Sequence, residues 1–228
     1  MDNDPAGSAR CGAILAAATL NGHEKALVVG VGDGLLALTL AAEVAHVTAV
    51  DPAPNRLTAL DLAARRKRQT NITTLVADLR SYDAVPKAFD LVVSSYALHE
   101  LPDRDKIAFL SSARRWLRPN GKLVIADRML ARPEMNEGRN GLQTDGIERT
   151  RDGVASLWRN ARNVLRFGPP PGPRRRADAD FWQQQATLAG FRVLSCQRLG
   201  ARACVLVAGI GPAGATRPPA RRGPRNMG

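Results

Sequence analysis

The chain alternates short apolar runs with longer segments whose apolar residues recur at helical spacing. The apolar runs have the length of buried strands and fall near residues 26–30, 46–50, 73–77, 89–94 and 122–127. The helical spacing occupies residues 9–21, 34–43, 54–68 and 104–117. This alternation predicts an α/β domain in which helices cover both faces of a parallel sheet.

The pattern changes near the end of the chain. Two more strand-like runs, at 191–199 and 203–209, are joined only by Gly200, Ala201 and Arg202. A crossover between parallel strands needs a dozen or more residues, so these two runs predict an antiparallel hairpin. We therefore expect seven strands in all, five parallel ones followed by the hairpin.

The turn after the first predicted strand carries alternate glycines. Gly30, Gly32 and Gly34 allow a ligand to approach backbone N–H groups without an intervening side chain. The second predicted strand ends at Asp51, and an acid at that place accepts hydrogen bonds from ribose hydroxyls. The two features together predict a cofactor that contains a nucleoside. The dinucleotide fingerprint would need its third glycine at position 35, which is Leu35.

The G-x-G-x-G pattern resembles motif I of the class I S-adenosylmethionine-dependent methyltransferases. Three later segments resemble the same family in the same order: LVADL at 75–79, FDLVVSSYALHEL at 89–101 and RWLRPNGKLVIAD at 115–127. Asn120 replaces the first glycine of the family's Pro-Gly-Gly turn, and asparagine tolerates left-handed backbone. The resemblance covers residues 25–127 and resumes at 181–207.

This resemblance implies a Rossmann-like, doubly wound, mostly parallel seven-stranded sheet that ends in an antiparallel hairpin. It also implies S-adenosyl-L-methionine as cofactor, with the glycines against its amino-acid portion, Asp51 on the ribose and Asp78 near the adenine amino group. The predicted cofactor-binding residues are Gly30, Gly32, Asp33, Gly34, Asp51, Asp78, Leu79 and Ser94. Ser95 and Tyr96 are the predicted substrate-binding residues.

One position departs from the family pattern. Motif I normally carries Asp or Glu two positions before its first glycine, where it helps to hold the methionine end of the cofactor, and this chain has Val28. Either Asp33 takes over that role, or the affinity is lower, or the protein is a binder without catalytic activity.

His99 is the candidate catalytic base. It follows the fourth predicted strand, at the sheet edge where open α/β folds bind ligands, and an imidazole can accept a proton near neutral pH. The structural alternative is a histidine that caps the next helix or bonds to Glu100. In the family that the chain resembles, methyltransferases of nucleic-acid bases and glutamine amides carry [DNS]-P-P-[YFW] after this strand. This chain lacks that sequence, so the resemblance disfavours those acceptors.

Cysteine usage and charge restrict the function further. Cys11, Cys196 and Cys204 show no C-x-x-C spacing, which disfavours a metal site and a disulfide framework and fits a reducing cytoplasm. The formal net charge is +12, but the basic residues gather in local clusters at 65–68, 174–176 and beyond 212. Aromatic residues make up only 4%, so platforms for stacking nucleic-acid bases are scarce.

The predicted organisation is a methyltransferase domain over residues 1–211 and a disordered basic tail over 212–228. Residues 128–180 form an insertion whose helical stripe at 140–167 predicts either a lid over the acceptor pocket or a helix on the sheet edge. No apolar run reaches the roughly 18 residues of a membrane span, and we reject a signal peptide at 13–20 because Asp2 and Asp4 precede it.

We therefore predict a cytoplasmic enzyme that transfers a methyl group from S-adenosyl-L-methionine to a small-molecule acceptor, with no metal and no membrane contact. Two alternatives remain. The charge favours an RNA or protein methyltransferase, although we expect nucleic-acid binding to be weak and to depend on the tail. Val28 favours a non-catalytic or NAD-binding Rossmann-like protein.

Overall fold

The computed structural model describes residues 5–129, 177–199 and 203–211. Its helices are α1 (Pro5–Ala18), α2 (Leu35–Ala41), α3 (Pro54–Arg66), α4 (Asp103–Trp116) and α6 (Ala179–Leu188). Its strands are β1 (Lys25–Val29), β2 (His46–Asp51), β3 (Ile72–Val76), β4 (Phe89–Ser95), β5 (Leu117–Asp127), β6 (Arg192–Leu199) and β7 (Ala203–Gly209). The predicted lid at 140–167 and the predicted tail at 212–228 lie outside the described residues.

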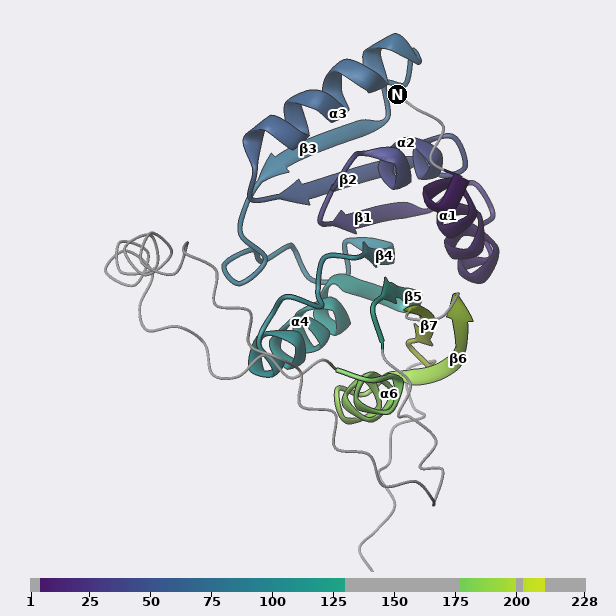
Figure 1. The fold of residues 1–228 in the computed structure, drawn as a ribbon, viewed down its shortest axis with the longest axis vertical. Helices are drawn as coiled ribbons and strands as arrows, with labels where there is room; N and C mark the ends of the chain where they lie inside the picture. Colours follow the sequence, from purple (N-terminus) through teal and green to yellow (C-terminus); the bar gives the residue numbers. More distant parts are fainter. Residues whose placement is uncertain (1–4, 130–176, 200–202, 212–228) are drawn as a thin grey trace, which may run out of the picture.

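The strands form one seven-stranded sheet in the order β3-β2-β1-β4-β5-β7-β6. Strands β1 to β5 pair in parallel, whereas β7 pairs antiparallel with both β5 and β6. Figure 1 shows the strongly twisted sheet, with β3 at one edge and the β6–β7 hairpin at the other. The predicted fold, a mostly parallel sheet closed by an antiparallel hairpin, is confirmed.

Helices cover the sheet on both faces because the central strands are apolar on both faces. In β1, Ala26 and Val28 face a core shared with α1, α2 and α3, while Leu27 and Val29 face a core shared with α4 and α6. All four side chains are at most 2% exposed. A strand buried on both sides reads as a continuous apolar run, which is why this segment was predictable from its sequence.

The sequence prediction differs from the structure at several boundaries, of which two have a clear physical cause, and in one helix. Helix α1 ends at Ala18 rather than at 21, because Thr19 has a φ of 53° and the Glu24 carboxylate accepts the N–H groups of Asn21 and Gly22 in the following turn. Strand β5 begins at Leu117, five residues early, because the chain leaves α4 in an extended conformation that pairs Leu117 with Phe89.

The helix that differs is α6, which the sequence analysis did not predict. Its signal was present: Asp178 caps the helix by accepting the N–H of Phe181 at 2.8 Å, and Trp182 and Ala186 are the buried pair one turn apart. The left-handed conformation expected for Asn120 is observed, with a φ of 66°.

The packing of α4 on the sheet gives a test of the fold. Leu110 is fully buried on α4, so Leu110→Ala should lower the free energy of unfolding by about 2–5 kcal/mol through lost burial and the cavity left behind. Ile107 on the same helix is 40% exposed, and Ile107→Ala should change stability by no more than about 0.5 kcal/mol. Chemical denaturation of the two variants measures both values, and equal losses would contradict the packing of this helix.

Candidate active site

A cavity of about 360 Å³ opens at the carboxyl edge of the sheet, beyond the ends of β1, β2 and β4. The next strand in the chain, β2, lies on one side of β1, whereas β4 lies on its other side. The cavity therefore lies where the strand order reverses. Open α/β sheets bind ligands at this switch point. The lining residues include Gly30, Gly32, Asp51, Asp78, Leu79, Ser95 and Tyr96, all of them predicted site residues.

The three glycines have different structural roles. All have left-handed backbone, with φ values of 79°, 58° and 82° at Gly30, Gly32 and Gly34. A Cβ on Gly30 would collide with Ala97, and a Cβ on Gly34 would press on Leu60 at 3.3 Å. Nothing lies within 4 Å of a Cβ built on Gly32, which lines the cavity. The first and third glycines therefore allow close packing, and the second exposes backbone to the cavity.

Asp51 fixes the glycine loop to the end of β2. Its side chain is 1% exposed, and its two oxygens accept the backbone N–H groups of Val31 at 2.9 Å and Ala53 at 2.8 Å. Arg56 on α3 contributes a longer ion-pair contact of 3.5 Å. A carboxylate has about four acceptor positions, so these bonds leave capacity for hydroxyl groups in the cavity.

Asp78 lies at the other side of the cavity and is paired with Arg80. The Arg80 side chain donates to both oxygens of Asp78, at 3.2 and 2.8 Å. The hydrogen bonds from Arg80 hold the pKa of the Asp78 carboxyl below its ordinary value, so it is ionised at neutral pH. Both residues line the cavity together with Leu79.

Three predicted cofactor-binding residues do not line the cavity. Asp33 is exposed, and its carboxylate accepts the N–H of Leu35 at the start of α2. Gly34 lies one residue further along, against α3. Ser94 is fully buried inside β4, and its hydroxyl has no hydrogen-bond partner in the described part of the chain. Direct cofactor contacts for these residues stay predictions, and the structure gives the first two a role in shaping the loop.

Val28 is part of the apolar core. It is fully buried in β1 and packs in the cluster that includes Ile14 and Ala18 of α1. No carboxylate is therefore available at position 28 to contact a ligand.

The chain beyond β4 brings Tyr96 and His99 to the same edge. Tyr96 adopts left-handed backbone, with a φ of 54°, and its N–H donates to Ala126 of β5 at 2.8 Å. The rings of Tyr96 and His99 meet edge to face, with centroids 6.3 Å apart. His99 lies just outside the residues that line the cavity, and its side chain is 23% exposed.

Asp127 at the end of β5 positions His99. One of its oxygens accepts the N–H groups of Leu98 and His99, at 2.9 and 3.0 Å. The other accepts the N–H of Arg128 and lies 2.8 Å from His99 Nδ1, as a close polar contact rather than an aligned hydrogen bond. The Nε2 atom is 4.0 Å from Glu100, on the exposed side of the ring. The arrangement holds one nitrogen against a buried carboxylate and leaves the other accessible.

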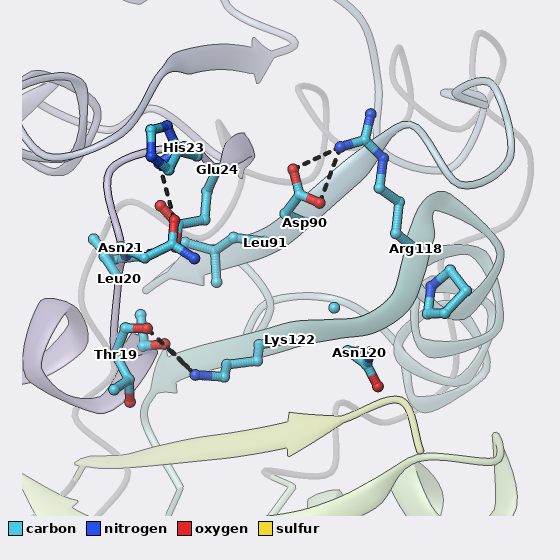
Figure 2. A pocket seen from close by; sticks show the side chains of 13 residues that line it. Thr19, Leu20, Asn21, His23, Glu24, Asp90, Leu91, Arg118, Asn120 and Lys122 are labelled. Atoms are coloured by element: carbon cyan, nitrogen blue, oxygen red, sulfur yellow. Dashed lines mark hydrogen bonds and ion pairs between the residues drawn. The ribbon is translucent and has the colours of Figure 1, made fainter. Parts of the chain in front are cut away.

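A second cavity, of about 420 Å³, lies at the opposite, amino edge of the sheet (Figure 2). Arg118 pairs there with Asp90, and Lys122 donates to the Ala18 carbonyl at the end of α1. Among the described residues, its lining holds no unpaired buried polar atom. We interpret it as a structural junction between α1, β4 and β5.

No group of three or more His, Cys, Asp or Glu side chains suited to a metal ion occurs among the described residues. Burial raises the pKa of the Cys196 thiol to about 11, so this cysteine is protonated and a poor ligand at neutral pH. The helices of the described segments are all too short or too polar to cross a membrane.

Sequence reasoning missed two residues at this edge, Asp127 and Arg10. Asp127 was recognised as the end of a strand, but only the fold places it beside His99, 28 residues away in the sequence. Arg10 lies on α1, before the first recognisable motif, and its guanidinium carbon is 4.7 Å from the centre of the Tyr96 ring. No local pattern indicates either contact.

Residues 26–121 match the family model described as a methyltransferase domain. A methyltransferase of Mycobacterium tuberculosis is 36% identical over 118 residues, which cover 50% of this chain and 55% of the relative. One of Oceanobacillus iheyensis is 29% identical over 126 residues, or 55% and 57% of the two chains. The chain thus spans little more than half the length of the curated relatives that it matches.

Solved structures share the fold at low sequence identity. A putative methyltransferase from Bacillus halodurans superposes with a TM-score of 0.65 at 15% identity, over 88% of this chain and 98% of its own. The N-methyltransferase NodS from Bradyrhizobium japonicum, in complex with S-adenosyl-L-homocysteine, gives a TM-score of 0.63 at 17% identity, over 92% and 89%. Residues 26–121 are therefore similar to a methyltransferase domain, and the described sheet has the fold of these solved methyltransferases.

Proposed function

We propose that this protein transfers a methyl group from S-adenosyl-L-methionine to a small-molecule acceptor. The observation that carries the proposal is the cavity at the carboxyl edge, where an open glycine backbone and two carboxylates converge. The strand order supports this function over the NAD-binding alternative, because an antiparallel β7 between β5 and β6 is absent from the dinucleotide-binding sheet.

The described residues fit the chemistry of this cofactor. Asp51 has acceptor positions left for the two ribose hydroxyls, and the ionised carboxylate of Asp78 can accept from an adenine amino group. Gly32 leaves space for the amino-acid portion. In this assignment Leu79 contacts the adenine face, and Asp33, Gly34 and Ser94 support the site from behind.

The cofactor supplies a methyl group that is already activated by its sulfonium. The protein therefore needs to position the acceptor in line, exclude water and accept a proton where the acceptor is a hydroxyl or an ammonium. Tyr96 and Ser95 form the wall nearest the acceptor. His99 is the proton acceptor, through Nε2, while Asp127 fixes the orientation of the ring.

A small molecule is the proposed acceptor class. Among structures with this fold, NodS is an N-methyltransferase, and coclaurine N-methyltransferase was solved with N-methylheliamine and S-adenosyl-L-homocysteine, with a TM-score of 0.51 over 56% of this chain. The described arginines that line the cavity, Arg56 and Arg80, are paired with Asp51 and Asp78, which disfavours a polynucleotide as the acceptor.

The first test of this function is cofactor binding. Titration calorimetry should detect S-adenosylhomocysteine binding in the micromolar range, about −8 kcal/mol at 1 μM. Asp51→Ala should weaken binding by about 1.5–3 kcal/mol, since it removes the ribose acceptor and also releases the glycine loop.

Asp61→Ala is the matched control, because Asp61 lies on α3, accepts a hydrogen bond from Thr74 of β3, and does not line the cavity. It should leave the affinity unchanged. Tight NAD binding without any S-adenosylhomocysteine binding would refute the proposed function.

The second test concerns His99. With the natural acceptor, His99→Ala should lower the methyl-transfer rate by about 10²- to 10⁴-fold, the usual contribution of a general base, and leave cofactor affinity nearly unchanged. A protonatable base makes the rate of the unaltered protein decline at acid pH. The variant should lack this decline. Measured pH–rate profiles of the two proteins decide this point.

His46→Ala is the matched control, because His46 bonds to Thr73 at the far end of β2. It should keep the full rate. If His99→Ala also keeps the full rate and the same pH profile, His99 has a structural role and the acceptor binds already ionised.

A further inference from the structure

Helix α1 connects the two edges of the sheet. At its carboxyl end, the Ala18 carbonyl accepts a hydrogen bond of 2.7 Å from Lys122, at the amino edge of β5. About two turns earlier, Arg10 contacts Tyr96 at the carboxyl edge, where its guanidinium carbon lies 4.7 Å from the ring centre. The helix therefore delivers one cationic side chain to the rim of the candidate active site.

Among the described arginines at this rim, Arg10 differs from the others in having no ion pair with a carboxylate. Arg56 pairs with Asp51 and Arg80 pairs with Asp78, but no ion pair is formed by Arg10 within the described residues. Its Nε atom is buried and has no hydrogen-bond partner in this part of the chain. The residue is partly exposed, and the Tyr96 ring beside its guanidinium offers no hydrogen-bond acceptor of its own kind, so the group keeps donors that an anion could use.

The neighbours of Arg10 indicate where such an anion would lie. Tyr96 contacts Arg10 and also lines the cavity, next to Gly30 and Gly32. Asp78, at the other side of the cavity, is a hydrogen-bond acceptor and would repel an anion. An anionic group therefore fits beside Tyr96, the lining residue that Arg10 contacts.

We propose that Arg10 binds the α-carboxylate of the cofactor's amino-acid portion, as a charge-assisted and bidentate pair. This inference rests on the proposed function. Since Val28 offers no carboxylate for the α-ammonium group, this protein recognises the amino-acid end of its cofactor by the carboxylate. Arg10 is thus a ligand-binding residue contributed from outside the glycine motif.

The experiment pairs one ligand change with one residue change. Calorimetry measures the affinities of S-adenosylhomocysteine and of its decarboxylated analogue, which keeps the amino group, for the full chain and for Arg10→Gln. We expect the full chain to bind the analogue about 10- to 100-fold more weakly, the range for a hydrogen bond to a charged group. Arg10→Gln should bind both ligands equally, at the affinity of the weaker pair.

Two further variants sharpen the comparison. Arg10→Lys keeps the charge but not the bidentate geometry, so it should retain part of the preference for the carboxylate. Arg115→Gln removes an arginine that pairs with Asp83 at the end of α4, and it should retain all of the preference.

The outcomes separate the two proposals. If the full chain binds neither ligand, the proposed function fails, and this inference fails with it. If it binds both equally, or if Arg10→Gln keeps the full preference for the carboxylate, Arg10 does not bind this group although the proposed function stands. Should Arg10→Gln not fold, the comparison of the two ligands on the unaltered chain still decides against the inference when their affinities are equal.

Discussion

The candidate site depends on the carboxylate of Asp51 more than on any other group. It is buried, and it accepts N–H groups from the glycine loop after β1 and from the turn before α3. Because the carboxyl ends of parallel strands lie at one edge, a single side chain at the tip of β2 can hold both connections. In the proposed function the same carboxylate that orders the loop also accepts from a ribose, so local stability and ligand binding would share one residue.

Asp127 has the corresponding role on the other side of the sheet. It accepts the N–H groups of Leu98, His99 and Arg128, and so fixes the chain after β4 to the end of β5. The side chain of His99 then has one nitrogen next to a buried charge. Two buried carboxylates at strand ends therefore set the positions of the glycine loop and of the proposed base.

The sequence was sufficient for the sheet, because its central strands are apolar on both faces and its hairpin loop is too short for a crossover. It was also sufficient for the residues that follow strands directly, such as Gly32, Asp51 and Asp78, since strand order alone brings them to one edge. It was not sufficient for contacts between distant elements, or for the orientation of neighbouring residues in a strand. Ser94 and Ser95 are adjacent in the sequence, and only the register of β4 shows that Ser95 faces the cavity.

The segment that matches the family model does not contain all the residues on the acceptor side of the candidate site. The match covers residues 26–121, which include the glycine loop, Asp51, Asp78 and His99. The residue that orients His99 and the arginine over Tyr96 lie on β5 and α1, outside that segment. In the proposed function the nucleoside site lies within the matched segment, whereas residues outside it support the amino-acid end of the cofactor and the base. Such an arrangement would allow related chains to keep one cofactor while the surroundings of the acceptor change. Differences in acceptor choice among such relatives should therefore be sought at α1 and at the end of β5, rather than in the glycine loop.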